Sequence, residues 1–483
     1  MKKFALVQLI PKDMRNQESI NLGFEIVKNI IKKKGWQVDT YKFGDNIENI
    51  NTYDIIGFSI FYFTQMLNLI PFLRYNNIEP LWEKRNRKPL LIAGGQGIQN
   101  PKPISKFIDV FCMGEAEGVL EYILDNYKDI HILSKNKYLY IPSISEKINF
   151  NTSTEIINSE PVIYNKNAMI ELTRGCKYRC KFCQYGWTNG KYREKDIELV
   201  KQQILYIKNK GIKNINLLSC NLGGYSKINE VLDFCIKEKI RLMNTDMRIN
   251  EYTEEIAEKL NILKVRTLKV GIESFSEKTR FGVNKNISNN QLNTFIDRAL
   301  KHNISNLHFY LIYGLPNERN YDEWFFYMKY IKDKIKTVNR NIRVEFSITN
   351  FEPAIYTPFE KSSFIDFNDK HEFIRKYLIK QEELGYIKQP VRTKDYKNSH
   401  GRLGRKEKSY NIGMWLLHGD ETIGDILYEL NINGIGRSIK DNVYDKIYTL
   451  CKSKPYVYQI MDIQNKNENI WKSTTPVYRN GGL

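Results

Sequence analysis

The chain lacks the features that assign a protein at once to a membrane, secreted or repeat class. Its 483 residues contain no run of about 18 apolar side chains, which argues against a membrane-spanning helix, and the apolar part of the first segment is too short for a signal peptide. Repeats, low-complexity tracts and the nucleotide-binding pattern G-x-G-x-x-G are absent as well. We therefore expect a globular, cytoplasmic protein of about two or three domains, without a membrane partner.

Histidine and cysteine are scarce. The chain has six histidines and seven cysteines, and only three of the cysteines cluster, so a disulfide framework of the secreted kind is not expected. The other four stand singly in apolar segments, where a cysteine usually acts as a small buried hydrophobic residue; these are Cys112, Cys220, Cys235 and Cys451.

Acidic residues are too few to balance the basic ones. The chain has 74 Lys and Arg against 55 Asp and Glu, and its net charge of +19 is compatible with a nucleic-acid partner. However, the many Asn, Ile and Tyr residues are typical of AT-rich coding, which adds lysine without a functional cause. Residues 386–408 hold eight basic and two acidic side chains, and this stretch is either a solvated loop or a contact for a phosphate-bearing substrate.

Turning to what is present, short apolar runs alternate with amphipathic stretches over residues 1–135. This alternation predicts an α/β domain with a doubly wound, Rossmann-like parallel sheet, and its clearest helix covers residues 18–34. Two loops at the carboxyl ends of the strands, 93–98 and 113–118, are rich in glycine, which lets a backbone approach a ligand closely. The predicted strands are 4–9, 36–41, 54–60, 89–93 and 110–113.

Three further regions follow the first domain. Residues 136–165 are rich in Asn, Ser and Pro and predict a linker. Residues 166–360 predict an open, partial (β/α)6 barrel, and residues 361–483 predict a mainly helical substrate or accessory region, helical to about residue 452. The predicted barrel strands are 168–173, 214–219, 240–244, 267–272, 307–312 and 344–349.

Cys176, Cys180 and Cys183 form a C-x3-C-x2-C triplet directly after the first barrel strand, at the edge where barrels carry catalytic groups. Three thiolates can hold three irons of a cubane iron–sulfur cluster and leave the fourth iron open to a non-protein ligand. Structural zinc is the weaker alternative, because it needs four ligands and no histidine lies within 40 residues of the triplet.

The triplet, with Phe182 directly before its last cysteine, is similar to the cluster loop of radical S-adenosylmethionine enzymes. The resemblance implies a [4Fe-4S] cluster whose open iron is chelated by S-adenosylmethionine, a 5'-deoxyadenosyl radical, and a reductase such as flavodoxin or ferredoxin. It also implies that Phe182 offers its ring face to the adenine.

Four later segments resemble motifs of the same family and occur in the same order. They are L-L-S-C-N-L-G-G-Y at 217–225, N-T-D-M-R-I at 244–249, G-I-E-S at 271–274 with N-K at 284–285, and G-L-P-N-E at 314–318. A simpler interpretation exists for each; Glu273 and Arg248, for example, could be an ion pair in the barrel mouth. The resemblance implies further cofactor contacts at Ser219, Asn221, Gly223, Gly224, Asn244, Arg248, Glu273, Ser274 and Gly314.

The first domain resembles the cobalamin-binding domain that precedes the barrel in many of these enzymes. The resemblance rests on segments 53–60, 92–97 and 114–118, and implies cofactor contacts at Gly94, Gly95, Gly114 and Glu115. The usual D-x-H-x-x-G motif is missing, and we interpret His131 as part of a surface element. The domain therefore either binds cobalamin without a lower histidine or has lost it.

We expect an enzyme that functionalises a C–H bond, by methyl transfer if cobalamin is bound, on a nucleotide, a nucleic acid or another phosphate-bearing substrate. A methylthio-transferring enzyme normally carries three more clustered cysteines before the barrel, where this chain has only Cys112. Two alternatives stay open: a non-catalytic iron–sulfur protein that binds nucleic acid, and a radical enzyme without cobalamin that acts on a small metabolite or a peptide.

Overall fold

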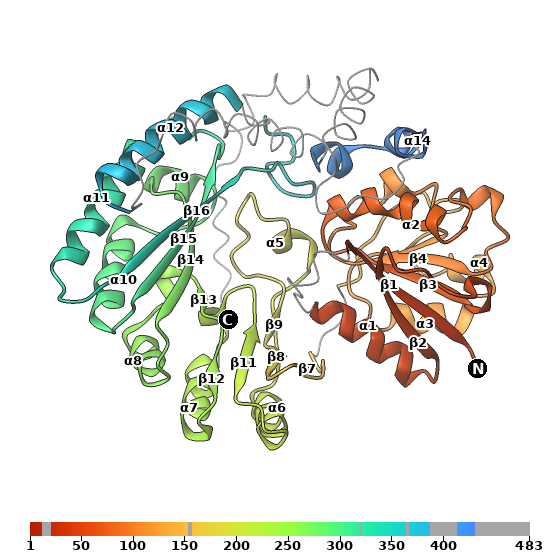
Figure 1. Ribbon diagram of the computed structural model, residues 1–483, viewed down its shortest axis with the longest axis horizontal. Helices are drawn as coiled ribbons and strands as arrows, with labels where there is room; N and C mark the ends of the chain where they lie inside the picture. The colour runs from red at the N-terminus through yellow and green to blue at the C-terminus, as the bar shows by residue number, and fades with distance from the viewer. Residues whose placement is uncertain (12–20, 153–156, 319, 364–366, 387–412, 430–483) are drawn as a thin grey trace, which may run out of the picture.

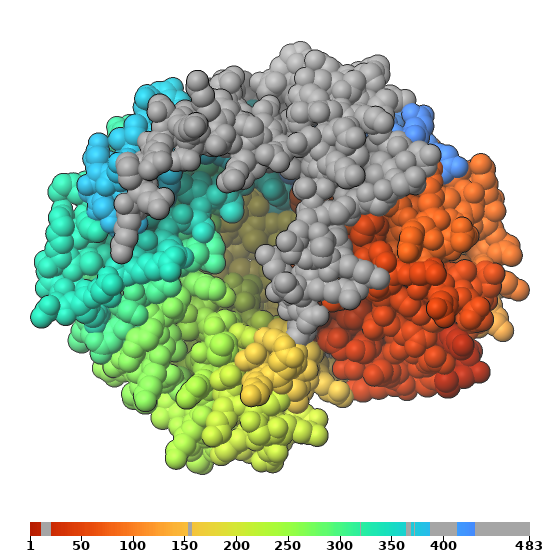
Figure 2. All heavy atoms as spheres, viewed as in Figure 1, coloured from red at the N-terminus to blue at the C-terminus, as the bar shows by residue number. Residues whose placement is uncertain are grey.

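The computed structural model describes residues 1–11, 21–152, 157–318, 320–363, 367–386 and 413–429 (Figure 1). Two lobes make up the described chain, and Figure 2 shows the first domain in red and orange on one side and the barrel in yellow to cyan on the other. The basic stretch at 388–408, Cys451 and the tail predicted to follow the last helix lie outside the described residues. Among the described helices, none is long and apolar enough to cross a bilayer.

The first domain is a six-stranded sheet in the order β2-β1-β3-β4-β5-β6, in which the first five strands are parallel. Buried runs such as Ile-Ile-Gly-Phe in β3 form the centre of the sheet, as expected where both faces are covered. The predicted doubly wound sheet is confirmed, with five strands near the predicted positions. The strands are β1 (Lys3–Pro11), β2 (Gln37–Phe43), β3 (Ile55–Ser59), β4 (Leu90–Gly94), β5 (Val110–Cys112) and β6 (Leu139–Tyr140).

Helices cover both faces of this sheet. On one face α1 (Leu22–Lys33) and α3 (Val119–Asn126) bury residues such as Phe24 and Ile123 in one hydrophobic core. On the other face α2 (Leu69–Tyr75) and α14 (Glu421–Glu429) pack into a second core. The strand order changes direction between β1 and β3, and such a switch point opens a crevice at the carboxyl edge of a parallel sheet.

The second lobe is an open barrel made of two four-stranded sheets, β12-β11-β8-β7 and β13-β14-β15-β16. All six predicted strands are present, and the short strands β7 and β13 are additional. In β14 and β15 buried residues alternate with less buried ones, because one face packs on the outer helices and the other lines the barrel. The strands are β7 (Val162–Tyr164), β8 (Asn167–Glu171), β11 (Asn214–Leu218), β12 (Arg241–Leu242), β13 (Asp246–Met247), β14 (Thr267–Glu273), β15 (Asn306–Tyr313) and β16 (Arg343–Asn350).

The outer helices of the barrel share one large hydrophobic core with its strands. Helices α6, α8 and α10 begin with a side-chain cap; the side chain of Asp196, for example, accepts from the peptide N–H groups of Glu198 and Leu199 at the start of α6. The helices are α6 (Ile197–Asn209), α7 (Ile228–Glu238), α8 (Glu254–Ile262), α10 (Asn289–Lys301) and α11 (Asp322–Lys336).

The segment expected to be a linker, residues 136–165, contributes a strand to each lobe. Within it, β6 pairs antiparallel with β5, and β7 pairs antiparallel with β8. The segment expected to link the two domains therefore also supplies an edge strand to each sheet.

The described part of the third region contacts both lobes. Helix α12 (Phe367–Glu383) packs on α11 through Phe373, whose ring centroid lies 5.5 Å from that of Trp324. Near α14, the side chain of Asn100 donates to the backbone oxygens of Leu417 and Gly419, at 3.0 and 2.7 Å. The chain thus returns from the barrel to the first domain before α14.

Replacing Gly114 with alanine should destabilise the first domain more than the same change at Gly118. Both glycines have positive φ, +88° and +76°, but a Cβ on Gly114 would lie 2.3 Å from the backbone oxygen of Asn151, whereas one on Gly118 meets no atom within 4 Å. We expect Gly118→Ala to cost about 1 kcal/mol and Gly114→Ala about 2 kcal/mol more. Chemical denaturation of the full chain measures both, and equal losses would contradict this explanation.

Candidate cluster and cofactor site

The three clustered cysteines lie on the loop between β9 (Thr173–Arg174) and α5 (Tyr185–Thr188), which we call the cluster loop. Figure 1 places this loop between the barrel strands and the first domain. Gly175 turns the chain into this loop with a φ of +73°, and a Cβ there would lie 2.4 Å from the backbone oxygen of Lys191. The Lys181 N–H donates to the backbone oxygen of Val283 at 2.9 Å, which fastens the loop to the barrel. Cys180 is buried, and Cys176 and Cys183 are half-buried. Cys220, by contrast, is exposed, so the expectation that it is a small buried hydrophobic residue was wrong.

Positive charge surrounds these thiols. The Nη1 atom of Arg248 lies 3.8 Å from the sulfur of Cys180, and its guanidinium lies 3.9 Å from the ring centroid of Tyr178. A hydrogen bond with the Cys220 thiol, helped by the charges of Arg248 and Lys285, lowers the pKa of Cys176 to about 7. Burial instead raises the pKa of Cys183 to about 11.

The residues present fit an iron–sulfur cluster by two observations. Three thiol donors come from one short loop, and cations face them from the barrel, where they would offset the negative charge of a thiolate-bound cluster. Across the described ranges, no three His, Cys, Asp or Glu side chains are gathered to hold a single metal ion. The fit therefore rests on the donor set and on the surrounding cations.

Glu273 ends β14 in a conformation that is uncommon for a residue with a side chain. Its φ is +69°, and the register between β14 and β15 shifts at this point. The carboxylate accepts from Lys285 Nζ at 2.7 Å, so its partner is this lysine of the N-K pair and not Arg248. Strained backbone of this kind is common at functional sites, and here it places an ion pair beside the cluster loop.

Gly223 and Gly224 lie against a carboxylate that the sequence did not single out. The carboxylate of Glu251 accepts from the side chain of Asn221, and its Oε1 atom lies 3.6 Å from Lys177 Nζ. A Cβ on Gly223 would lie 2.8 Å from the Cβ atom of Glu251, and one on Gly224 would lie 2.9 Å from the Nδ2 atom of Asn221, which donates to this carboxylate, so both positions favour glycine. Burial raises the pKa of Glu251 to about 7.

Several residues that were predicted to contact a cofactor use their polar side chains for hydrogen bonds within the protein. Asn244 donates to and accepts from the backbone of Leu217, both at 2.9 Å, and so continues the edge of β11. The hydroxyl of Ser219 lies 2.7 Å from that of Thr173. Ser274 is fully buried, and its hydroxyl donates a hydrogen bond to the buried carboxylate of Glu318.

Phe182 and the segment after Gly314 lie in one apolar cluster near the cluster loop. Phe182 packs against this cluster, whose buried members include Val283, Leu315 and Phe351. Gly314 has a φ of +82° and donates its N–H to the hydroxyl of Tyr321 at 3.3 Å. The structure thus brings the predicted adenine contact together with the G-L-P segment, although they are more than 100 residues apart in the chain.

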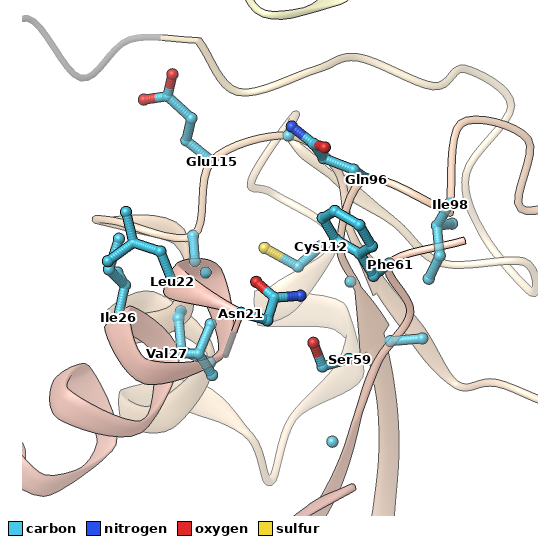
Figure 3. A pocket seen from close by; sticks show the side chains of 18 of the residues that line it. Asn21, Leu22, Ile26, Val27, Ser59, Phe61, Gln96, Ile98, Cys112 and Glu115 are labelled. Atoms are coloured by element: carbon cyan, nitrogen blue, oxygen red, sulfur yellow. The ribbon is translucent and has the colours of Figure 1, made fainter. Parts of the chain in front are cut away.

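A cavity of about 590 Å³ lies at the carboxyl edge of the first sheet (Figure 3). Its lining includes Gly94, Gly95, Gly114 and Glu115 from the predicted loops, and also Arg174 and Tyr185 from the segments that flank the cluster loop. The cavity therefore extends from the first sheet to the barrel, at the switch point between β1 and β3.

The glycines of these loops serve close packing of the chain. A Cβ on Gly95 would lie 2.3 Å from the backbone oxygen of Ile60, and one on Gly114 would lie as close to that of Asn151. Figure 3 shows Asn21 and Cys112 in the same cavity. His131, by contrast, is exposed on α4 (Ile130–Leu133) and is not part of the lining, which agrees with its interpretation as a surface element.

Arg174 joins the two halves of the site. Its guanidinium donates to Glu171 at 2.8 Å, to Glu117 at 2.6 Å and to Glu115 at 3.3 Å. Glu115 also accepts from Arg193 at 2.6 Å. The carboxylate predicted as a cofactor contact is thus held by two arginines of the barrel, and we call these five residues the Arg174 network. The sequence analysis missed Arg174, Arg193 and Glu251, because each acquires its role from residues distant in the chain.

This combination of a doubly wound domain, an open barrel and a thiol triplet at their junction defines an iron–sulfur protein with a cofactor cavity. Residues 170–331 match the family model described as Radical SAM superfamily, and residues 28–147 match the one described as Radical SAM proteins, N-terminal. The chain belongs to the radical S-adenosylmethionine superfamily and is an enzyme whose cofactors are a [4Fe-4S] cluster and S-adenosylmethionine.

Two proteins with similar sequences align with different shares of this chain. A protein of Methanocaldococcus jannaschii with no characterised activity is 25% identical over 373 residues, which is 74% of this chain and 79% of that protein. The tRNA-2-methylthio-N(6)-dimethylallyladenosine synthase of Phocaeicola vulgatus is 26% identical over 165 residues, or 31% of this chain and 33% of that enzyme.

Two solved structures share the fold. The methyltransferase TsrM from Kitasatospora setae, with tryptophan and an S-adenosylmethionine analogue bound, has a TM-score of 0.53 at 12% identity and covers 72% of this chain and 73% of its own. The cobalamin-dependent radical enzyme OxsB, with aqua-cobalamin bound, has a TM-score of 0.53 at 14% identity and covers 96% of this chain and 80% of its own. The predicted order of Rossmann-like domain and partial barrel is therefore confirmed.

We expect Glu251 to bind the amino group of S-adenosylmethionine, because its carboxylate lies beside Gly223 and Gly224. Glu251→Gln should raise the dissociation constant for S-adenosylmethionine about ten-fold, which corresponds to about 1.4 kcal/mol. Glu258→Gln, at an exposed position on α8, is the matched control. Anaerobic calorimetry of the cluster-loaded protein measures both affinities. An unchanged affinity in the Glu251 variant would assign this carboxylate a purely structural role.

Proposed function

We propose that this enzyme functionalises a C–H bond with the help of a corrinoid bound in the cavity of the first domain. The observation that carries the proposal is the cavity itself, which is lined by residues of the first sheet and by residues that flank the cluster loop. A corrinoid there would lie beside the cluster and S-adenosylmethionine, as a methyl carrier requires.

When bound, the cluster and S-adenosylmethionine supply a 5'-deoxyadenosyl radical, and a corrinoid supplies a methyl group. The chain's own residues bind and orient these groups. The three cysteines hold the cluster, while Arg248 and Lys285 offset its negative charge. Glu251 would accept a hydrogen bond from the methionine amino group. The apolar cluster around Phe182 would exclude water from the adenine.

The walls of the cavity suit a large, mostly apolar ligand with polar edges. Leu22, Ile26 and Val27 form an apolar wall from α1, and Asn21, Ser59 and Gln96 add polar groups (Figure 3). None of the described lining residues is histidine. We therefore propose that cobalamin binds without a histidine below the cobalt, as the missing D-x-H-x-x-G motif suggested.

Cobalamin binding can be read from the colour of the protein. Wild-type protein mixed with hydroxocobalamin and desalted should keep about one cobalamin per chain and show its visible absorption. Gln96→Trp should reduce retention at least about five-fold, because the exposed Gln96 side chain borders the cavity and an indole would fill that space. Gln202→Trp, exposed on α6, is the control. A colourless wild-type protein would end the corrinoid proposal.

A nucleotide or nucleic acid is the substrate that we propose. The excess of positive charge and the partial similarity to a tRNA-modifying enzyme support this choice. Comparing modified nucleosides and nucleotides in cells with and without the gene tests it. A difference confined to peptides or apolar metabolites would favour the alternative substrate classes.

Cleavage of S-adenosylmethionine distinguishes the proposed enzyme from the alternative, a non-catalytic iron–sulfur protein. Anaerobically reconstituted protein should bind about four irons per chain and, with dithionite, convert S-adenosylmethionine to 5'-deoxyadenosine or S-adenosylhomocysteine. Cys180→Ala should lower product formation at least about 100-fold, because one of the three predicted iron ligands is lost. Cys235→Ala, in the barrel core, is the control. A fully loaded wild-type protein that releases neither product would contradict the proposed catalysis.

A further inference from the structure

The inner face of the open barrel carries an aromatic side chain that lies outside the hydrophobic cores. In β15 the side chains of Leu307 and Phe309 are buried against the outer helices, so Tyr310 points from the opposite face into the barrel (Figure 1). Tyr310 is 36% exposed, which is unusual for a ring in the middle of a central strand. Its hydroxyl forms no hydrogen bond with the residues that the structure describes.

His308 supports this ring from one side. The two rings are stacked, with centroids 4.5 Å apart and an interplanar angle of 26°. The imidazole is fixed at both nitrogens, because Nε2 lies 2.7 Å from the hydroxyl of Ser347 and Nδ1 lies 3.2 Å from a carboxylate oxygen of Glu345. We call Tyr310 and His308 the stacking pair. His308 covers one face of the Tyr310 ring and leaves the other face open.

Polar groups surround the stacking pair on the inner face. The strand register places Asp246, Lys269, His308 and Glu345 opposite one another in one row across β13, β14, β15 and β16. Asp246 is accessible to solvent, yet the surrounding protein raises the pKa of its carboxyl by desolvation, against the charges of Lys269 and His308. Solvent access combined with desolvation is expected of a group that lines a hollow.

The stacking pair lies close to the cofactor site. Ile312 follows Tyr310 by two residues on the same face of β15 and packs against the apolar cluster that also contacts Phe182. The Cα atoms of Tyr310 and Ile312 are therefore about 7 Å apart along the strand. On the other side, the register pairs Tyr310 with Gly271, where an added Cβ would lie 2.6 Å from Glu273 Oε1 of the ion pair beside the cluster loop.

We propose that the stacking pair binds the base of a nucleotide substrate on the open face of Tyr310. Every nucleobase has a flat π face, and a base that stacks on an aromatic side chain gains about ten-fold in affinity. The carboxylates and the lysine of the row can pair with the amino and carbonyl groups at the edge of a base, which a purely apolar ring lacks. The inference rests on the proposed nucleotide substrate and does not depend on the corrinoid.

The test measures nucleotide binding to the full chain, loaded with its cluster and saturated with S-adenosylmethionine so that the adenine site is filled. Anaerobic equilibrium dialysis without a reductant avoids turnover. The probes are AMP, GMP, CMP and UMP, with ribose 5-phosphate as the probe that has no base. We expect at least one nucleotide to bind wild-type protein about ten-fold more tightly than ribose 5-phosphate.

Substitutions then assign this gain to the ring. Tyr310→Leu should weaken binding of that nucleotide about ten-fold, whereas Tyr310→Phe, which keeps the ring, should stay within about two-fold of wild type. His308→Ala should weaken it about three-fold, and His308→Phe, which restores a ring beside Tyr310, should recover the affinity. Tyr206→Leu, at an exposed position on α6, is the matched control. All variants are compared at equal iron content, and their affinity for ribose 5-phosphate should not change.

The outcomes separate this inference from the proposed function. A nucleotide that binds Tyr310→Leu as tightly as wild type would overturn the inference and leave the nucleotide proposal standing. Wild-type protein that binds every nucleotide no more tightly than ribose 5-phosphate would contradict both. If Tyr310→Leu lost affinity for S-adenosylmethionine instead, the ring would belong to the cofactor site, and the inference would again be overturned. Retention of cobalamin is independent of these results.

Discussion

The Arg174 network is the interaction on which the arrangement of the site depends. Burial alone lowers the pKa of a guanidinium, but hydrogen bonds and charge from Glu171 and Glu117 more than offset this effect, and the net pKa of Arg174 is raised. A buried arginine without its carboxylates would be costly, so the first domain, which supplies Glu115 and Glu117, must lie against the barrel that supplies Arg174. The same contact brings the cavity and the cluster loop together.

The parallel strands of both lobes explain why the cavity of the first domain and the cluster loop of the barrel lie at the same contact. In each lobe the carboxyl ends of the strands carry the loops with functional side chains, and the two edges face one another across the Arg174 network. At this edge of the barrel Cys180, Arg248 and Glu273 come close enough to interact, although they lie at the ends of three different strands. Short loops at the ends of several strands can therefore form one cofactor site together, and no single long loop is needed.

Much of the fold could be predicted from the chain because its signals are local. Buried runs such as the one in β3 and amphipathic stretches such as α1 encode their own secondary structure, and the cysteine triplet encodes its donor set by spacing alone. The roles of single polar residues could not be predicted in this way. Asn244 and Ser274 occupy the positions that the family resemblance implied, yet their side chains bind Leu217 and Glu318 of the protein itself.

The amino-acid sequence by itself determined the cysteine triplet, the two α/β units and the superfamily, because these depend on residue type and on spacing along the chain. Only the tertiary structure decided which charges face the thiols, that Glu251 lies beside Gly223 and Gly224, and that Arg174 of the barrel meets Glu115 and Glu117 of the first domain. The physical reason is that electrostatic and hydrogen-bonding partners are chosen by distance in space. Residues separated by many strands and helices acquire partners only when the sheets have formed and packed.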